Sequence, residues 1–382
     1  MRGLGLLFAN KAIRVYFFGL TSIIIPIYLA VIGYPPLYVG IAIGTLVASN
    51  IFSNLLLTFL GDKIGRKKLL LIFSLMMFSS GLVLFISESY AAILLACFIG
   101  NISTTGTEAG PFQSVETGVL HTYVEPSRLN KTFGFYNLIG YSASSLGAFS
   151  ASIPSYFSGS SQSFHLLFLF YAFAGLAIFF CYTKIEIREK SNNLKFKLNK
   201  DVFQLSSLGF VDAFGGGFVS QSILSYWFYF TYHVSLEGLG IIFFAVNVVT
   251  ALSILGATYI ASYLGNLRTM IYTHVISNIF LIAIPLAGSL LGSLAFLFLR
   301  QGMSQMDVPT RQAFMAEIFD PETRVSSFAL TNTFRNVGSV FGGPISGAML
   351  GAFLYSYPLI TGGVSKLVYD GSTFALYRKR AK

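Results

Sequence analysis

The chain has 382 residues, of which 54% are hydrophobic and only 10% are charged, and its formal net charge is +10. Soluble domains carry roughly 25% charged residues, so this composition excludes an ordinary soluble protein and indicates a membrane protein. The two cysteines, Cys97 and Cys181, both lie in apolar runs, which argues against a disulfide framework and against a metal site. We therefore expect no metal and no cofactor.

Long uncharged runs occur along the whole chain. A helix needs about 20 apolar residues to cross a bilayer. The runs predict an all-α polytopic membrane protein with twelve transmembrane helices. The predicted spans are 13–33, 37–60, 69–87, 90–114, 132–154, 164–183, 203–231, 236–260, 269–288, 290–310, 326–354 and 356–377.

The turn between the second and third spans carries the densest charge. From Gly61 to Lys68 it holds one acid and four bases. Further bases fall in every second loop, and the intervening loops contain neither Lys nor Arg. The positive-inside rule then places both termini in the cytoplasm, where the bases face anionic lipid rather than nucleic acid. We expect a monomer in the plasma membrane, whose partners are the lipid bilayer and a small-molecule substrate.

The chain shows signs of an internal duplication. The polar segment 184–201 is predicted to be a cytoplasmic linker between an N-terminal six-helix half, 1–183, and a C-terminal six-helix half, 202–382. The pattern Thr58-x-x-x-Asp62-x-x-Gly65 recurs as Thr258-x-x-x-Ser262-x-x-Gly265, and two acid-proline motifs recur in the same order. Repeated halves of this kind are typical of secondary transporters.

The loop from Asp62 to Lys67 resembles the signature of the major facilitator superfamily, and the resemblance extends over the whole chain. It implies two six-helix halves that expose a central site alternately to the two sides of the membrane. It also implies that this loop closes the cytoplasmic side. The implied gate residues are Asp62, Gly65, Arg66, Lys67, Arg128, Arg311 and Arg324.

The resemblance does not resolve the subfamily. Proton-coupled drug exporters of this superfamily typically have a Gly-Pro motif in span five, whereas residues 140–147 contain no proline. Those exporters also often have an arginine early in span four, where this chain has Asn101.

Polar and charged residues inside the spans are the candidates for the substrate and coupling site, because a charge at mid-bilayer costs about 2.5–3.5 kcal/mol on insertion scales. We expect Arg300 to bind an anionic substrate group or an acid of the other half. Lys366 and Asp370 are spaced i, i+4 and are expected to pair, whereas His165 and His274 are interpreted as ordinary. The candidates are Arg300, Asp212, Glu108, Asp307, Asn101, Arg335, Lys366 and Asp370.

Alternative roles stay open for most of these candidates. Glu108 and Asp307 are interpreted either as substrate contacts or as gate and capping residues. Arg335 is interpreted either as a site residue or as a clamp of the cytoplasmic gate. Asp212 precedes three consecutive glycines that weaken its helix and is a candidate coupling acid.

These observations predict a secondary active transporter that moves a small organic solute by alternating access. A buried acid can exchange protons because burial disfavours its charged form, so proton coupling is part of the hypothesis. The resemblance favours export, because exporters are prevalent in that superfamily, and proton-coupled uptake of a nutrient or an organic anion is the alternative. A non-transporting receptor or scaffold is a more distant third. We expect no enzyme, because the sequence contains neither His-Glu-x-x-His nor Gly-x-Ser-x-Gly.

Overall fold

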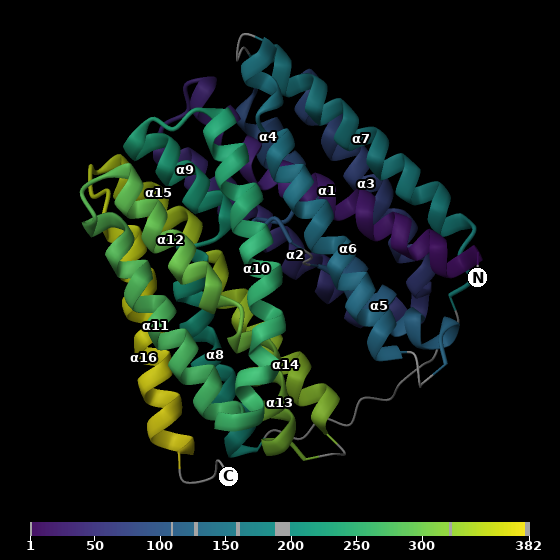
Figure 1. The fold of residues 1–382 in the computed structure, drawn as a ribbon. Helices are drawn as coiled ribbons and strands as arrows, with labels where there is room; N and C mark the ends of the chain where they lie inside the picture. The colour runs from purple at the N-terminus through teal and green to yellow at the C-terminus, as the bar shows by residue number, and fades with distance from the viewer. Residues whose placement is uncertain are drawn as a thin grey trace. The chain divides into compact units, whose positions relative to one another are not determined.

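The computed structural model describes residues 2–107, 110–125, 129–157, 161–187, 199–320 and 323–378. Within those ranges the regular structure is helical, and they contain no strand (Figure 1). Seven helical stretches there are long and apolar enough to cross a membrane. Each of the twelve predicted spans falls on one helix or on two consecutive helices. The all-α, polytopic prediction is therefore confirmed.

The first six predicted spans correspond to helices α1 to α7. Span four is divided between α4 and α5, and a short 3₁₀ helix, Ile153–Phe157, follows α6. The bounds are α1 Arg2–Val31, α2 Pro36–Ile64, α3 Arg66–Ile86, α4 Tyr90–Ile99, α5 Pro111–Tyr123, α6 Leu129–Ser150 and α7 Ser161–Thr183.

The last six predicted spans correspond to helices α8 to α16, and spans seven, ten and eleven are each divided in two. The division of span seven follows Gly215-Gly216-Gly217, and that of span eleven precedes Gly343-Pro344. The bounds are α8 Lys200–Gly217, α9 Gln221–Tyr232, α10 Leu236–Leu264, α11 Asn266–Leu286, α12 Leu290–Ser304, α13 Asp307–Ile318, α14 Arg324–Val340, α15 Gly342–Gly351 and α16 Tyr357–Tyr377.

The helix bounds repeat along the chain. Helix α10 has the bounds of α2 shifted by 200 residues, and α11 has those of α3 with the same shift. A single glycine separates α2 from α3, and another separates α10 from α11. Gly65 has φ of 98° and Gly265 has φ of 78°. A side chain is strained at such φ values, so glycine is needed at the same place in both halves. This agreement confirms the pseudo-symmetric halves expected from the sequence motifs.

The chain forms two compact units. Unit 1 contains the described residues up to 187 together with Ser220–Asn247, and unit 2 contains 199–219 together with the described residues from 248 onward. The segment Ser220–Asn247 follows the predicted linker in the sequence but belongs to unit 1. The two compact units therefore differ from the two halves predicted from the sequence. The predicted halves, 1–183 and 202–382 with the linker 184–201, describe the expected duplication and stay a prediction.

In unit 1 the main helix pairs are α1 with α6 and α3 with α7. Helices α1 and α6 approach so closely that a Cβ at Gly147 would collide with the carbonyl oxygen of Tyr16. Small residues permit this approach, which is how helices associate in a lipid environment.

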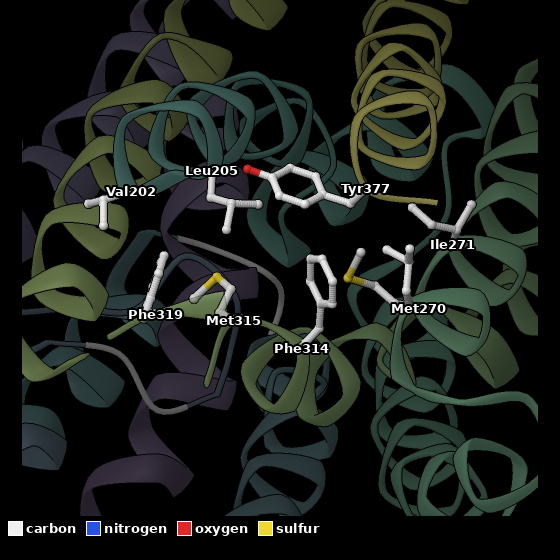
Figure 2. Packing of buried hydrophobic residues seen from close by; sticks show 9 residues of the cluster. Val202, Leu205, Met270, Ile271, Phe314, Met315, Phe319 and Tyr377 are labelled. Carbon is white, nitrogen blue, oxygen red and sulfur yellow. The ribbon is translucent and has the colours of Figure 1, made fainter. Parts of the chain in front are cut away.

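In unit 2, helix α8 packs against α14 and α16, while α11 packs against α12, α13 and α16. An apolar cluster joins the ends of α8, α11, α13 and α16 (Figure 2). Polar residues lie one turn away from this cluster on the same helices. His274 comes one turn after Met270 on α11, and Arg311 comes one turn before Phe314 on α13. The cluster thus positions the polar residues described next. Its members are Val202, Leu205, Leu267, Met270, Ile271, Phe314, Met315, Phe319 and Tyr377.

Candidate functional site

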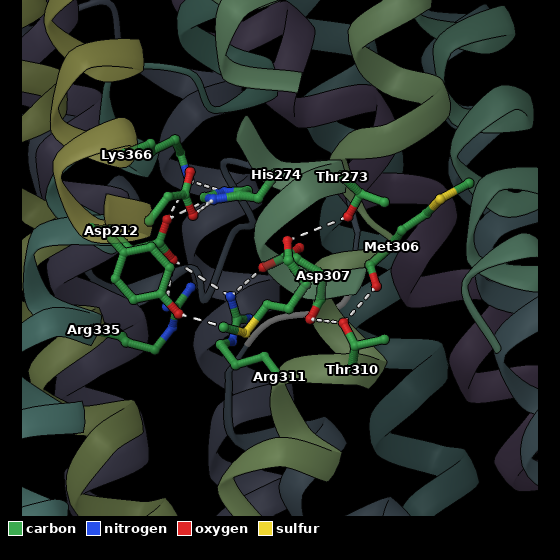
Figure 3. A network of polar contacts seen from close by, with 12 residues as sticks. Asp212, Thr273, His274, Met306, Asp307, Thr310, Arg311, Arg335 and Lys366 are labelled. Atoms are coloured by element: carbon green, nitrogen blue, oxygen red, sulfur yellow. Dashed lines mark hydrogen bonds and ion pairs between the residues drawn. The ribbon is translucent and has the colours of Figure 1, made fainter. Parts of the chain in front are cut away.

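A buried group of charged residues gathers around Asp212 in unit 2 (Figure 3). Asp212 lies on α8 and is 1% exposed. Its Oδ1 is 2.7 Å from Nζ of Lys366 on α16, and its Oδ2 is 2.5 Å from Nη1 of Arg335 on α14. Nη1 of Arg311 on α13 lies 3.5 Å from the same Oδ2. One carboxylate therefore holds three helices to α8.

His274 on α11 extends this group to a second carboxylate. Its Nδ1 lies 2.7 Å from Oδ1 of Asp370, and its Nε2 lies 3.6 Å from Oδ1 of Asp212. Nζ of Lys366 is 3.5 Å from the same Nε2. Asn278 donates from Nδ2 to Oδ2 of Asp370 at 3.1 Å. The imidazole thus lies between two buried acids, in reach of both.

Asp307 completes the group by accepting a hydrogen bond from Arg311 at 2.5 Å, one turn apart on α13. We call the assembly the Asp212 network. Its three acids balance its three bases when His274 is neutral, and protonation of His274 adds one positive charge. Histidine is the side chain that most readily changes charge near neutral pH. Its members are Asp212, His274, Asp307, Arg311, Arg335, Lys366 and Asp370.

Two expectations from the sequence need correction here. Lys366 and Asp370 share a face of α16, but Lys366 bonds to Asp212 and Asp370 bonds to His274. The wholly buried Asp212 needs a counter-charge, so the tertiary partner prevails over the local one. The interpretation of His274 as ordinary was also wrong. One sequence feature could have indicated a polar site here: His274 and Asn278 are four residues apart and so lie on the same face of α11.

Arg300 lies outside the Asp212 network. It is on α12 and only 7% exposed. Its Nη1 donates to Oε1 of Gln301 at 3.0 Å, and Gln301 donates in turn to the hydroxyl of Thr250 on α10. Its Nε has no hydrogen-bond partner among the described residues. Within the same part of the chain, no carboxylate forms an ion pair with this guanidinium at 4.0 Å or less.

Unit 1 contains a second buried ion pair, between Arg14 on α1 and Glu116 on α5, both 0% exposed. Nη2 of Arg14 is 2.6 Å from Oε2 of Glu116, and Nη1 is 3.1 Å from Oε1. The hydroxyl of Tyr182 donates to Oε1 at 2.5 Å, and that of Tyr136 donates to Oε2. Each carboxylate oxygen therefore accepts two hydrogen bonds. Glu116 is not among the residues predicted from the sequence, because its separation of 102 residues from Arg14 leaves no local signal.

The division of span four creates non-helical backbone between α4 and α5. Asn101 has φ of 52° and Gly106 has φ of 71°. Non-helical backbone at membrane depth needs hydrogen-bond partners from the protein, and here four other helices provide them. Tyr171 donates to the carbonyl of Gly100 at 2.6 Å, and Asn50 donates to that of Ile102 at 2.9 Å. The backbone amide of Ser222 donates to the carbonyl of Thr104 at 3.0 Å, and Ser144 donates to that of Gly106 at 2.6 Å. The non-helical segment between α4 and α5 is therefore stabilised by hydrogen bonds from other helices of unit 1.

Asn101 lies at the start of this break and is 1% exposed. Its Oδ1 has no hydrogen-bond partner in the described part of the chain. Among the predicted gate residues, Lys67 donates to the carbonyl of Thr183 at 3.0 Å, and Arg324 begins α14.

Other predicted site and gate residues are placed differently or not at all. Arg311 belongs to the Asp212 network. Arg66 follows Gly65 as the first residue of α3. Glu108, Arg128 and the side chain of Asp62 lie outside the described residues.

The fold and these buried charges define a polytopic membrane transporter. The family model of the Major Facilitator Superfamily matches residues 7–299, and the chain belongs to that superfamily. It is an integral membrane protein and a secondary transporter rather than an enzyme.

Known proteins resemble the chain at two levels. It is 26% identical over 395 residues to the Uncharacterized membrane protein YJR124C of Saccharomyces cerevisiae, which covers 90% of this chain and 87% of that protein. A mutant of the nucleoside transporter NupG matches with a TM-score of 0.79 and 14% identity over 99% of this chain and 100% of its own.

Two more solved structures share the fold. A bacterial homologue of the iron transporter ferroportin, in its inward-facing state, has a TM-score of 0.76 and 14% identity over 97% of both chains. A D-xylose-proton symporter has a TM-score of 0.72 and 12% identity over 96% of both chains. At these identities the likeness concerns the fold alone.

Proposed function

We propose that this protein couples the movement of a small organic solute to the movement of protons, and that the Asp212 network is the coupling site. The observation that carries this proposal is His274 between the buried carboxylates of Asp212 and Asp370, at 3.6 Å and 2.7 Å. Chains of carboxylates and histidines inside membrane spans commonly relay protons.

Competition for one oxygen atom supplies the coupling. Nζ of Lys366 and Nε2 of His274 both approach Oδ1 of Asp212, at 2.7 Å and 3.6 Å. A proton on Nε2 makes His274 a donor to this oxygen and brings a second positive charge next to Lys366. The network then carries one excess charge in a region of low dielectric, which favours a shift of Lys366 on α16 away from α8. Proton binding thereby changes how two helices of unit 2 are held together.

Export is the direction that we propose, because exporters are prevalent in this superfamily. Uptake of the solute together with a proton is the second candidate, and the shared fold with a D-xylose-proton symporter favours it. In either case we propose that the protein works as a monomer in the plasma membrane, with both termini in the cytoplasm, and that the gate residues of the 62–67 loop close the cytoplasmic side.

The test uses purified protein in liposomes that contain a pH-sensitive dye. Nucleosides, pentoses, hexoses and small carboxylates are added in turn, and internal pH is recorded with and without an imposed pH gradient. The wild type should move protons when one of these solutes is present, and the sign of the pH change gives the direction.

The variants His274→Gln and Asp370→Asn separate coupling from transport. Both should exchange labelled solute across the membrane at equal pH yet move no protons. Thr273→Val is the matched control on α11, because its hydroxyl bonds to the carbonyl of Thr269 on its own helix, and it should behave as the wild type. Proton movement at the wild-type ratio in both network variants would reject the coupling site.

A further inference from the structure

Arg300 is a buried cation that forms no ion pair with the described residues. It is 7% exposed, and among the described residues no carboxylate lies within ion-pair distance. An arginine stays charged at any physiological pH, and a charge at mid-span usually has a partner or faces a site. Asp307, the acid seven residues further along the chain, is 2.5 Å from Arg311. Among the described residues, the three acids of the Asp212 network are each paired within that network, and none of them forms an ion pair with Arg300.

The described hydrogen-bond partner of the Arg300 side chain is the neutral amide of Gln301. Oε1 of Gln301 accepts from Nη1 at 3.0 Å, and the amide nitrogen of Gln301 bonds to the hydroxyl of Thr250. The side-chain amide is therefore fixed at both ends, by α12 on one side and by α10 on the other. A guanidinium has five N–H donors in a planar fork. Gln301 takes one of them, and the buried Nε has no partner in the part of the chain that the structure describes.

We propose that Arg300, oriented by Gln301, binds an oxyanion group of the transported solute, either a carboxylate or a phosphate. Such an oxyanion accepts two parallel N–H···O bonds from a guanidinium. Its negative charge would neutralise Arg300, which the uncharged amide of Gln301 cannot do. The inference rests on the proposed transport of a solute, but not on its coupling to protons. An anionic lipid headgroup has the same chemistry, so the test separates the two sources.

The test measures the thermal unfolding of the whole protein in nanodiscs of phosphatidylcholine, without any pH gradient. The probes form matched pairs that differ in the oxyanion: succinate and succinamide, glucose 6-phosphate and glucose, AMP and adenosine. We expect one or more of the anions to raise the melting temperature in a saturable manner, while its neutral partner does not. Arg300→Gln should weaken that binding at least tenfold, and Arg300→Lys should retain part of it.

Gln301→Glu keeps the proposal testable if Arg300→Gln does not fold. It places a carboxylate 3.0 Å from Nη1, so the protein should fold and lose its response to the anions. The proposal is overturned if no anion stabilises the wild type, if neutral partners act equally, or if Gln301→Glu responds as the wild type does.

Two further results identify the source of the oxyanion and separate this proposal from the proton coupling. If phosphatidylglycerol in the nanodisc stabilises the wild type but not Arg300→Gln, and no soluble anion does, the oxyanion belongs to a lipid and the proposal for the solute is overturned. The melting temperatures are measured without a pH gradient, so a failure of proton coupling in the liposome assay leaves the anion result unchanged.

Discussion

The buried pair of Arg14 and Glu116 gives the most direct test of the energetics of this protein. Both residues are 0% exposed, and together with Tyr136 and Tyr182 they join α1, α5, α6 and α7. Replacing Arg14 by Met removes the base that pairs with the buried carboxylate, and replacing Glu116 by Leu removes the acid that pairs with the buried guanidinium.

The expected magnitude follows from the loss of one partner. Removing one member of a buried ion pair costs about 3–5 kcal/mol, whereas replacing both members by apolar residues is often neutral or stabilising. Arg14→Met and Glu116→Leu should therefore each lower the free energy of unfolding by about 3–5 kcal/mol. The double variant should lose far less than the sum. Tyr182→Phe removes one hydrogen bond to a charged group and should cost about 1.5–3 kcal/mol.

The assay is reversible denaturant unfolding in detergent micelles, followed by the fluorescence of Trp227 and by circular dichroism. Glu237→Gln is the control, because Glu237 is exposed in the first turn of α10 and its loss should change stability by less than about 0.5 kcal/mol. Additive losses in the Arg14→Met/Glu116→Leu double variant would refute the reasoning, since they would show that the two side chains stabilise the protein independently.

Two smaller predictions concern backbone geometry. Gly65→Ala should cost about 1–3 kcal/mol of unfolding free energy because its φ is 98°. By contrast, Gly61→Ala lies inside α2, where an added Cβ would come no closer than 3.6 Å to a neighbouring side chain, that of Arg66, and it should be neutral or slightly stabilising in the same denaturation assay. Equal effects would contradict the role of φ. Tyr171→Phe leaves the carbonyl of Gly100 unpaired and should cost about 1–3 kcal/mol. It should also speed hydrogen exchange of the amides of 101–107, and unchanged exchange would show that Tyr171 does not support the break.

Local features of the sequence were sufficient for the overall class. The length of the apolar runs predicted the spans, because a bilayer imposes a nearly fixed helix length. The motifs at Thr58 and Thr258 predicted the duplication, and the helix bounds repeat with the shift that these motifs imply. The weak points of spans seven and eleven were also visible, since Gly215 to Gly217 and Pro344 act on their own helix.

The break in span four was predicted as part of one continuous span, 90–114, although its residues are weak helix formers. The residues from Gly100 to Thr107 have no proline, but two of them are glycines and five are Asn, Ser or Thr, which are poor helix formers. The break exists because Asn50, Ser144 and Tyr171 donate hydrogen bonds to its carbonyls from other helices. Partners distant in the sequence leave no periodic signal.

The sequence by itself indicated a polytopic membrane transporter with an internal repeat, and it singled out most members of the Asp212 network as candidates. Only the tertiary structure decided how they pair. Lys366 bonds to Asp212 instead of Asp370, and His274 lies between these two acids. Arg300 forms no ion pair with a carboxylate of the described residues. Apolar length and glycine content act within one helix, whereas charge compensation in a low-dielectric interior depends on which helices pack together.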